Sequence, residues 1–125
     1  MSDDHLFNFQ NSLKQLKLFC EMPIQNDRDR AGIIQAFEFT FEQSWKAIQK
    51  KTKDQGVEIV SPKQAYMFAI QSRWIAKEDE KLWIGLINDR NLTTHTYKEQ
   101  LAKKIVEKIL QQYLFMLEKL FEKLK

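Results

Sequence analysis

Arg90 and His95 are the residues whose types and spacing could do chemistry together. They lie five positions apart, near the end of a predicted helix. An imidazole titrates near neutral pH, whereas a guanidinium is a permanent cation. In one cleft they would suit phosphodiester cleavage: the imidazole moves a proton on the ribose 2′-hydroxyl or the leaving oxygen, and the guanidinium stabilises charge on phosphorus. A structural alternative stays open, in which Arg90 forms an ion pair and His95 caps a turn.

Glu38 and Tyr97 extend this candidate site. The helical step of 100° places Glu38 on the apolar stripe of a long predicted helix, where a carboxylate needs a cation or hydrogen-bond donors. Arg90 is the obvious cation, so Glu38 could orient Arg90, or the two could form a purely structural pair. Tyr97 lies two residues after His95. Its hydroxyl could be exposed there, although a tyrosine in this position could equally serve packing alone.

Signatures of other common chemistries are missing from the sequence. It contains no Gly-rich phosphate loop, His-Glu-x-x-His, Cys-x-x-Cys or Gly-x-Ser-x-Gly. Cys20 is the only cysteine, which excludes an intrachain disulfide and a Cys-rich zinc site. We therefore assign no metal and no cofactor to the site. The net charge of +3 is too small to indicate a nucleic-acid binder by itself, and no DNA partner is expected.

The elements that must position these residues are predicted to be helices. The chain has 125 residues, 43% of them hydrophobic, with only three glycines and two prolines, which predicts one globular domain (residues 1–125) of few, long elements. Apolar residues recur at steps of three and four over much of its length. The predicted helices span residues 4–21, 29–55, 62–74 and 78–91, with a β-like connection at 57–60 and a break at the weakly helical run 92–94. A capping box at Thr96 opens a long final helix, whose apolar positions include Tyr113. The predicted fold is all-α, an antiparallel four- to five-helix up-and-down bundle.

Neither export nor membrane insertion is expected. The chain begins Met1-Ser2-Asp3-Asp4, without the basic and then apolar order of a signal peptide, and its longest apolar runs are about six residues. Together with the single cysteine, these features favour a cytoplasmic protein with no membrane partner.

The segment from Arg90 to Tyr97 resembles the Arg-x4-His-x-Tyr motif of HEPN-domain proteins. It reads Arg90-Asn91-Leu92-Thr93-Thr94-His95-Thr96-Tyr97, and the polar Asn91 after the arginine also fits. Further segments resemble the branch of this family known as nucleotidyltransferase substrate-binding proteins. They are residues 28–42 with Trp45-Lys46, then Ser61-Pro62, then Trp83 before Asp89-Arg90-Asn91. The resemblance covers about residues 5–120, and its motifs are specific jointly rather than singly.

The resemblance implies a HEPN-like bundle, similar to the helical domain of nucleotidyltransferases. It implies a homodimer that brings two Arg-x4-His motifs together at the two-fold axis, with Arg90 and His95 as the active site of a metal-independent RNase. Glu38 and Asn91 would support this site. Many members of the branch are toxins encoded beside a minimal nucleotidyltransferase antitoxin. Where the motif has its tyrosine, that partner transfers AMP from ATP to it and silences the RNase, which would make Tyr97 the modified residue.

Two other functions stay open at this point. In the older interpretation of the branch, the helical protein is a non-catalytic substrate-binding subunit of a two-component nucleotidyltransferase. The chain could also be a helical dimerisation module whose polar groups are structural. It lacks the Gly-Ser and paired aspartates with which a nucleotidyltransferase holds Mg²⁺ and triphosphate, so we do not expect it to be the catalytic chain.

Overall fold

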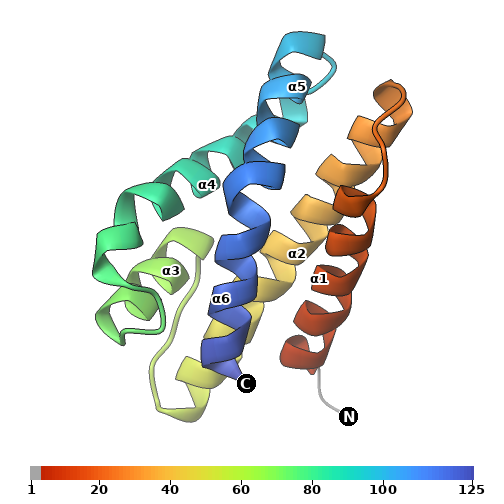
Figure 1. Cartoon of the computed structure of the whole chain (residues 1–125). Helices are drawn as coiled ribbons and strands as arrows, with labels where there is room; N and C mark the ends of the chain where they lie inside the picture. The colour runs from red at the N-terminus through yellow and green to blue at the C-terminus, as the bar shows by residue number, and fades with distance from the viewer. Residues whose placement is uncertain (1–3) are drawn as a thin grey trace.

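Long antiparallel helices form the scaffold of the molecule. The computed structural model describes residues 4–125, and every regular element in that range is helical. Helices α1 (His5–Glu21) and α2 (Asp27–Asp54) run side by side in opposite directions (Figure 1). The last long helix begins as α5 (Glu99–Lys108) and ends as α6 (Leu114–Leu124), and it packs against both of them. The all-α bundle predicted from the sequence is confirmed.

Shorter helices cover the remaining side of α2. Helix α3 (Pro62–Gln71) packs on α2, and α4 (Glu80–Leu92) packs on α3 and runs obliquely toward the α5 end of the last long helix in Figure 1. Short 3₁₀ turns flank α4: η1 (Lys77–Asp79) precedes it and η2 (Thr93–His95) follows it. The connection at residues 57–60, predicted to be β-like, forms no strand.

Local signals set several helix ends where the sequence predicts them. The Ser61 hydroxyl accepts a hydrogen bond from the Gln64 amide at 3.2 Å, and Pro62 follows as the first helical residue of α3. Helix α2 ends at Asp54, and Gly56 adopts a φ of 83°, a left-handed conformation that favours glycine. Both predicted boundaries are therefore confirmed.

The capping box predicted at Thr96 is wrong. Helix α5 begins only at Glu99, and no side chain caps its first turn. The Thr96 hydroxyl instead donates to the Thr93 carbonyl at 2.9 Å. Threonine hydroxyls can bond nearby backbone groups in turns as readily as they cap helices, and here the hydroxyl bonds the turn instead of capping α5. As a result, Tyr97 lies in the connection before α5 rather than in a helical turn.

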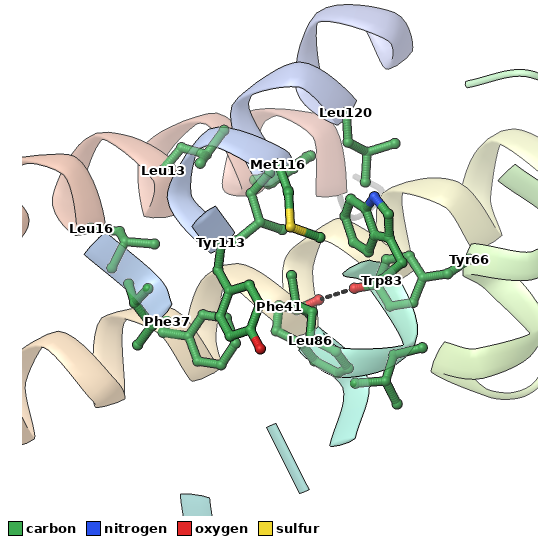
Figure 2. Packing of buried hydrophobic residues seen from close by; sticks show 14 of the residues in the cluster. Leu13, Leu16, Phe37, Phe41, Tyr66, Trp83, Leu86, Tyr113, Met116 and Leu120 are labelled. Carbon is green, nitrogen blue, oxygen red and sulfur yellow. Dashed lines mark hydrogen bonds between the residues drawn. The ribbon is translucent and has the colours of Figure 1, made fainter. Parts of the chain in front are cut away.

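Aromatic side chains tie α2, α3 and α4 together in the core. Trp83 of α4 packs against Tyr66 of α3, with ring centroids 4.8 Å apart (Figure 2). Phe41 of α2 lies 5.5 Å from the same tyrosine ring. The Tyr66 hydroxyl is hydrogen-bonded to Ser44 at 2.5 Å, and burial raises the pKa of this tyrosine, so the hydroxyl stays protonated. This cluster holds α4 against α3 and α2.

Two sequence-based expectations concern the cell rather than the fold. Within residues 4–125, no helix is both long and apolar enough to cross a membrane. Residues 1–3, whose order entered the argument against a signal peptide, lie outside the described residues.

Burial, with smaller contributions from the charges of Glu118 and Glu21, raises the pKa of Cys20 from 9.0 to about 11, so this thiol is protonated at neutral pH.

Candidate active site

Arg90 lies in the last turn of α4 and is held by contacts to α2 and η2. Its Nη1 donates to the Thr93 hydroxyl at 3.0 Å and lies 3.6 Å from Glu38 Oε2. The guanidinium carbon also lies 5.7 Å from the centroid of the Phe41 ring, which is cation–π geometry. The structure therefore pairs Arg90 with Glu38, the partner that the helical periodicity predicted.

Thr93 bridges this ion pair, and the sequence argument missed it. Its hydroxyl lies 2.5 Å from Glu38 Oε2 and 2.7 Å from the Arg90 carbonyl oxygen, and its single hydrogen can go to either. The residue is only 5% exposed. The sequence predicted residues 92–94 merely as a weak helical run. The spacing of three from Arg90 was the available signal, because residues three apart share a helix face.

Replacing Thr93 by valine should destabilise the protein by about 1–3 kcal/mol. The change keeps the shape of the side chain but removes the hydroxyl, which leaves a half-buried Glu38 oxygen and an Arg90 donor without this partner. Urea unfolding followed by circular dichroism measures the effect. Thr94→Val is the matched control: Thr94 is exposed, and its hydroxyl makes only a 3.4 Å bond to the Asn91 carbonyl. Equal stability of the two variants would contradict the bridging role.

Arg90 keeps donor capacity that Glu38 and Thr93 do not use. Its Nε is buried and has no hydrogen-bond partner among the described residues, while the side chain as a whole is 27% exposed. A guanidinium has five N–H donors in a fixed plane. Arg90 is thus fixed in place and still accessible to an anionic group that approaches from outside.

His95 and Tyr97 lie in the exposed connection between α4 and α5. His95 ends η2, and its backbone carbonyl accepts a hydrogen bond from the Lys98 amide at 3.1 Å. The two rings meet edge to face, with centroids 6.1 Å apart and planes at 70°. Tyr97 is 78% exposed. Both side chains can therefore be reached by a macromolecule.

The structure brings only some of the predicted residues into contact. Arg90 contacts α2, whereas His95 is exposed in the next turn, and no hydrogen bond joins the two side chains in the part of the chain that the structure describes. Asn91 is exposed as well. Within one chain, then, Arg90, Asn91 and His95 lie at one helix junction. The Arg90 and His95 side chains, which the sequence predicted to converge on one cleft, are not hydrogen-bonded to each other there.

A second polar contact, also missed from the sequence, lies one residue before Arg90. Asp89 accepts a hydrogen bond from the hydroxyl of Tyr113, which ends a π-helical turn, η3 (Ile109–Tyr113), between α5 and α6. The sequence predicted Tyr113 as an apolar position of an uninterrupted helix. Its ring stacks on Phe37 of α2 at 5.6 Å (Figure 2). Burial, and then the bond to Asp89 and its charge, raise the pKa of Tyr113, so the hydroxyl remains a donor.

Comparison with known proteins covers nearly the whole chain. Residues 4–125 match the family model described as nucleotidyltransferase substrate binding protein like. The structure is similar to the crystal structure of a protein from Thermus thermophilus, with a TM-score of 0.85 and 33% sequence identity. That match covers 94% of this chain and 98% of the Thermus chain. No functionally curated protein matches the sequence. Family and fold therefore extend over the segment that carries Arg90, His95 and Tyr97.

Proposed function

Because the chain belongs to the family of nucleotidyltransferase substrate-binding-like proteins, we propose that it is a metal-independent endoribonuclease of the HEPN type. It would act as the toxin of a two-gene module. The observation that carries the proposal is the arrangement at one helix junction. There, Glu38 and Thr93 hold the cationic Arg90, and an exposed His95 follows five residues later.

The proposed reaction is internal transfer within the RNA chain. His95 takes the proton of a ribose 2′-hydroxyl, and that oxygen attacks the adjacent phosphorus. The bond to the 5′-oxygen of the next nucleotide breaks, and this oxygen leaves with a proton given by the imidazolium of His95. Arg90 stabilises the negative charge that builds up on the phosphoryl oxygens. The products are a 2′,3′-cyclic phosphate and a 5′-hydroxyl end.

A homodimer would complete this site. Within one chain, His95 is exposed and, among the described residues, makes no hydrogen bond to Arg90, which is paired with Glu38. Two large apolar side chains next to the site in sequence are also exposed: Phe39 by 60% and Leu92 by 41%. Pairing of two copies would set two Arg90–His95 pairs around the two-fold axis, and exposed apolar side chains such as these are typical of surfaces that pair.

The proposed partner is a minimal nucleotidyltransferase, which the family description implies. In the proposed modification, the Tyr97 hydroxyl gives up its proton to solvent water, its oxygen attacks the α-phosphorus of ATP, the bond to the β-phosphate breaks, and pyrophosphate leaves. Tyr97 is 78% exposed and its ring lies 6.1 Å from that of His95. An AMP group on Tyr97 would therefore occupy the space through which RNA must approach His95.

Co-expression with the neighbouring nucleotidyltransferase tests this proposal. The wild-type protein should gain AMP on Tyr97, detected by intact mass and peptide mapping, and growth arrest should be relieved. Tyr97→Phe should gain no AMP and should arrest growth even with the partner present. The other two tyrosines, Tyr66 and Tyr113, are 0% and 1% exposed and serve as internal controls that should stay unmodified. AMP on another residue, or relief of arrest in the Tyr97→Phe strain, would contradict the proposal.

The family description also favours a second candidate function, a non-catalytic subunit that binds a small substrate for the nucleotidyltransferase. Under that function, the purified dimer should be stabilised by the small substrate and should cleave no RNA. His95-dependent cleavage would reject it.

A further inference from the structure

We infer that a cavity beside Tyr97 binds a nucleobase that carries an exocyclic amino group. The cavity has a volume of about 260 Å³ and lies between the first turns of α2 and the beginning of α5. Tyr97 forms part of its wall. This inference deepens the proposed function, on which it rests, because it assigns a ligand class to the space next to His95.

The shape and lining of the cavity suit a planar base. Ile34 and Ala102 are 5% and 9% exposed and give it an apolar floor, and the ring of Tyr97 gives it an aromatic side. Proteins that recognise single-stranded RNA commonly hold a splayed base by stacking it on such a ring. A base bound here would bury its apolar faces away from water, while its polar edge would stay near the rim of the cavity.

The charges at the rim favour a base over a phosphate. Asp27 and Glu99 place two carboxylates at the cavity, and Arg30 is the one cation among its lining residues. Asp27 is paired with Arg30 at 2.9 Å, and Glu99 is paired with Lys103, outside the lining, at 3.6 Å. The lining thus has one more carboxylate than cation and no unpaired cation, which disfavours a phosphate group. Carboxylates only accept hydrogen bonds, so they favour the amino groups of adenine, cytosine or guanine over the carbonyl edge of uracil.

The neighbouring residues give such a base two possible sources. One is the RNA, whose nucleotide next to the cleaved bond would place its base in the cavity while the phosphate faces His95. The other is the adenine of an AMP group attached to Tyr97. If both use the same cavity, the attached adenine excludes the RNA base, and this competition would explain how the modification silences cleavage.

Nucleotide titration of the unmodified dimer tests the inference without requiring cleavage or modification. AMP should bind and perturb the NMR signals of residues around the cavity, and UMP should bind on the order of tenfold more weakly, the loss expected for one unmade base contact. Ala31→Phe fills the cavity mouth from an exposed position and should weaken AMP binding at least about tenfold. Gln35→Phe, one helical turn further along α2 and also exposed, is the matched control and should leave AMP binding unchanged. Equal binding of AMP and UMP, or equal behaviour of the two variants, would overturn the inference.

Two further readouts of Ala31→Phe distinguish the sources of the base. Loss of a preference for amino-bearing bases beside the cleavage points would assign the cavity to RNA, and loss of silencing in Tyr97-modified protein would assign it to the attached adenine. If the wild-type protein binds AMP more tightly than UMP but neither cleaves RNA nor is modified, only the proposed function fails. If the wild-type protein cleaves RNA and is modified, but Ala31→Phe changes neither the base preference nor the silencing, the inference fails and the proposed function stands.

Discussion

Replacing His95 by alanine should lower RNA cleavage by about 10²- to 10⁴-fold and leave the fold unchanged. A positioned general acid or base contributes about that factor, and His95 is the imidazole of the proposed site. Its side chain is exposed, so its removal should disturb little packing. The rate of cleavage of a labelled RNA in the presence of EDTA measures the effect, and thermal unfolding checks that the variant is folded.

His5→Ala is the matched control for this experiment. His5 is the other histidine of the chain. It is the first residue of α1, and its ring is hydrogen-bonded to Gln43 at 3.3 Å. Its removal should leave cleavage within about twofold of the wild-type rate, since surface changes away from a site usually have small effects. If His95→Ala cleaved as fast as the wild-type protein, His95 would have no catalytic role and the structural alternative, a turn-capping histidine, would take its place.

Replacing Trp83 by alanine should cost about 3–5 kcal/mol of folding free energy. Trp83 is 2% exposed and packs on Tyr66, so its truncation leaves a large cavity in the cluster that joins α3 and α4. Domains of this size have about 5–15 kcal/mol in total, so this loss removes a large share of the folding free energy. Because the cluster holds α4 against α3 and α2, the arginine at its end should lose its alignment with α2.

Urea unfolding of the purified variants, followed by circular dichroism, measures this loss. Leu82→Ala removes the neighbouring apolar side chain, which is 40% exposed, and should cost less than about 1 kcal/mol. Trp83→Phe keeps an aromatic ring at the same place and should fall between the two. Similar midpoints for Trp83→Ala and Leu82→Ala would show that the aromatic cluster is not the element that fixes α4.

Periodicity accounts for what the sequence predicted of this site. The apolar stripe on α2 places Glu38 toward the core side of the helix, where a carboxylate must find a cation. The apolar stripe on α4 likewise places Arg90 toward the core side, where a guanidinium must find an anion. Each position follows from local helical geometry. Charge complementarity then named Arg90 as the candidate partner of Glu38, and the structure places the two groups 3.6 Å apart.

Contacts that depend on tertiary register could not be predicted in this way. The Asp89–Tyr113 bond requires the π-helical turn in the last helix, and a pattern of apolar residues does not reveal one extra residue per turn. Threonine hydroxyls can bond a nearby backbone group or another side chain, and here the Thr96 hydroxyl donates to the Thr93 carbonyl while the Thr93 hydroxyl reaches Glu38 of α2. The missed residues are thus the polar ones whose partners lie on other elements or in turns.

The most direct test of the central proposal compares one preparation of the protein before and after AMP is attached to Tyr97, on one RNA and in the presence of EDTA. The account predicts that the unmodified protein cleaves the RNA and leaves 2′,3′-cyclic phosphate ends, that the modified protein does not, and that enzymatic removal of the AMP restores cleavage. Unmodified protein that leaves the RNA intact, or modified protein that cleaves it equally well, would contradict the account.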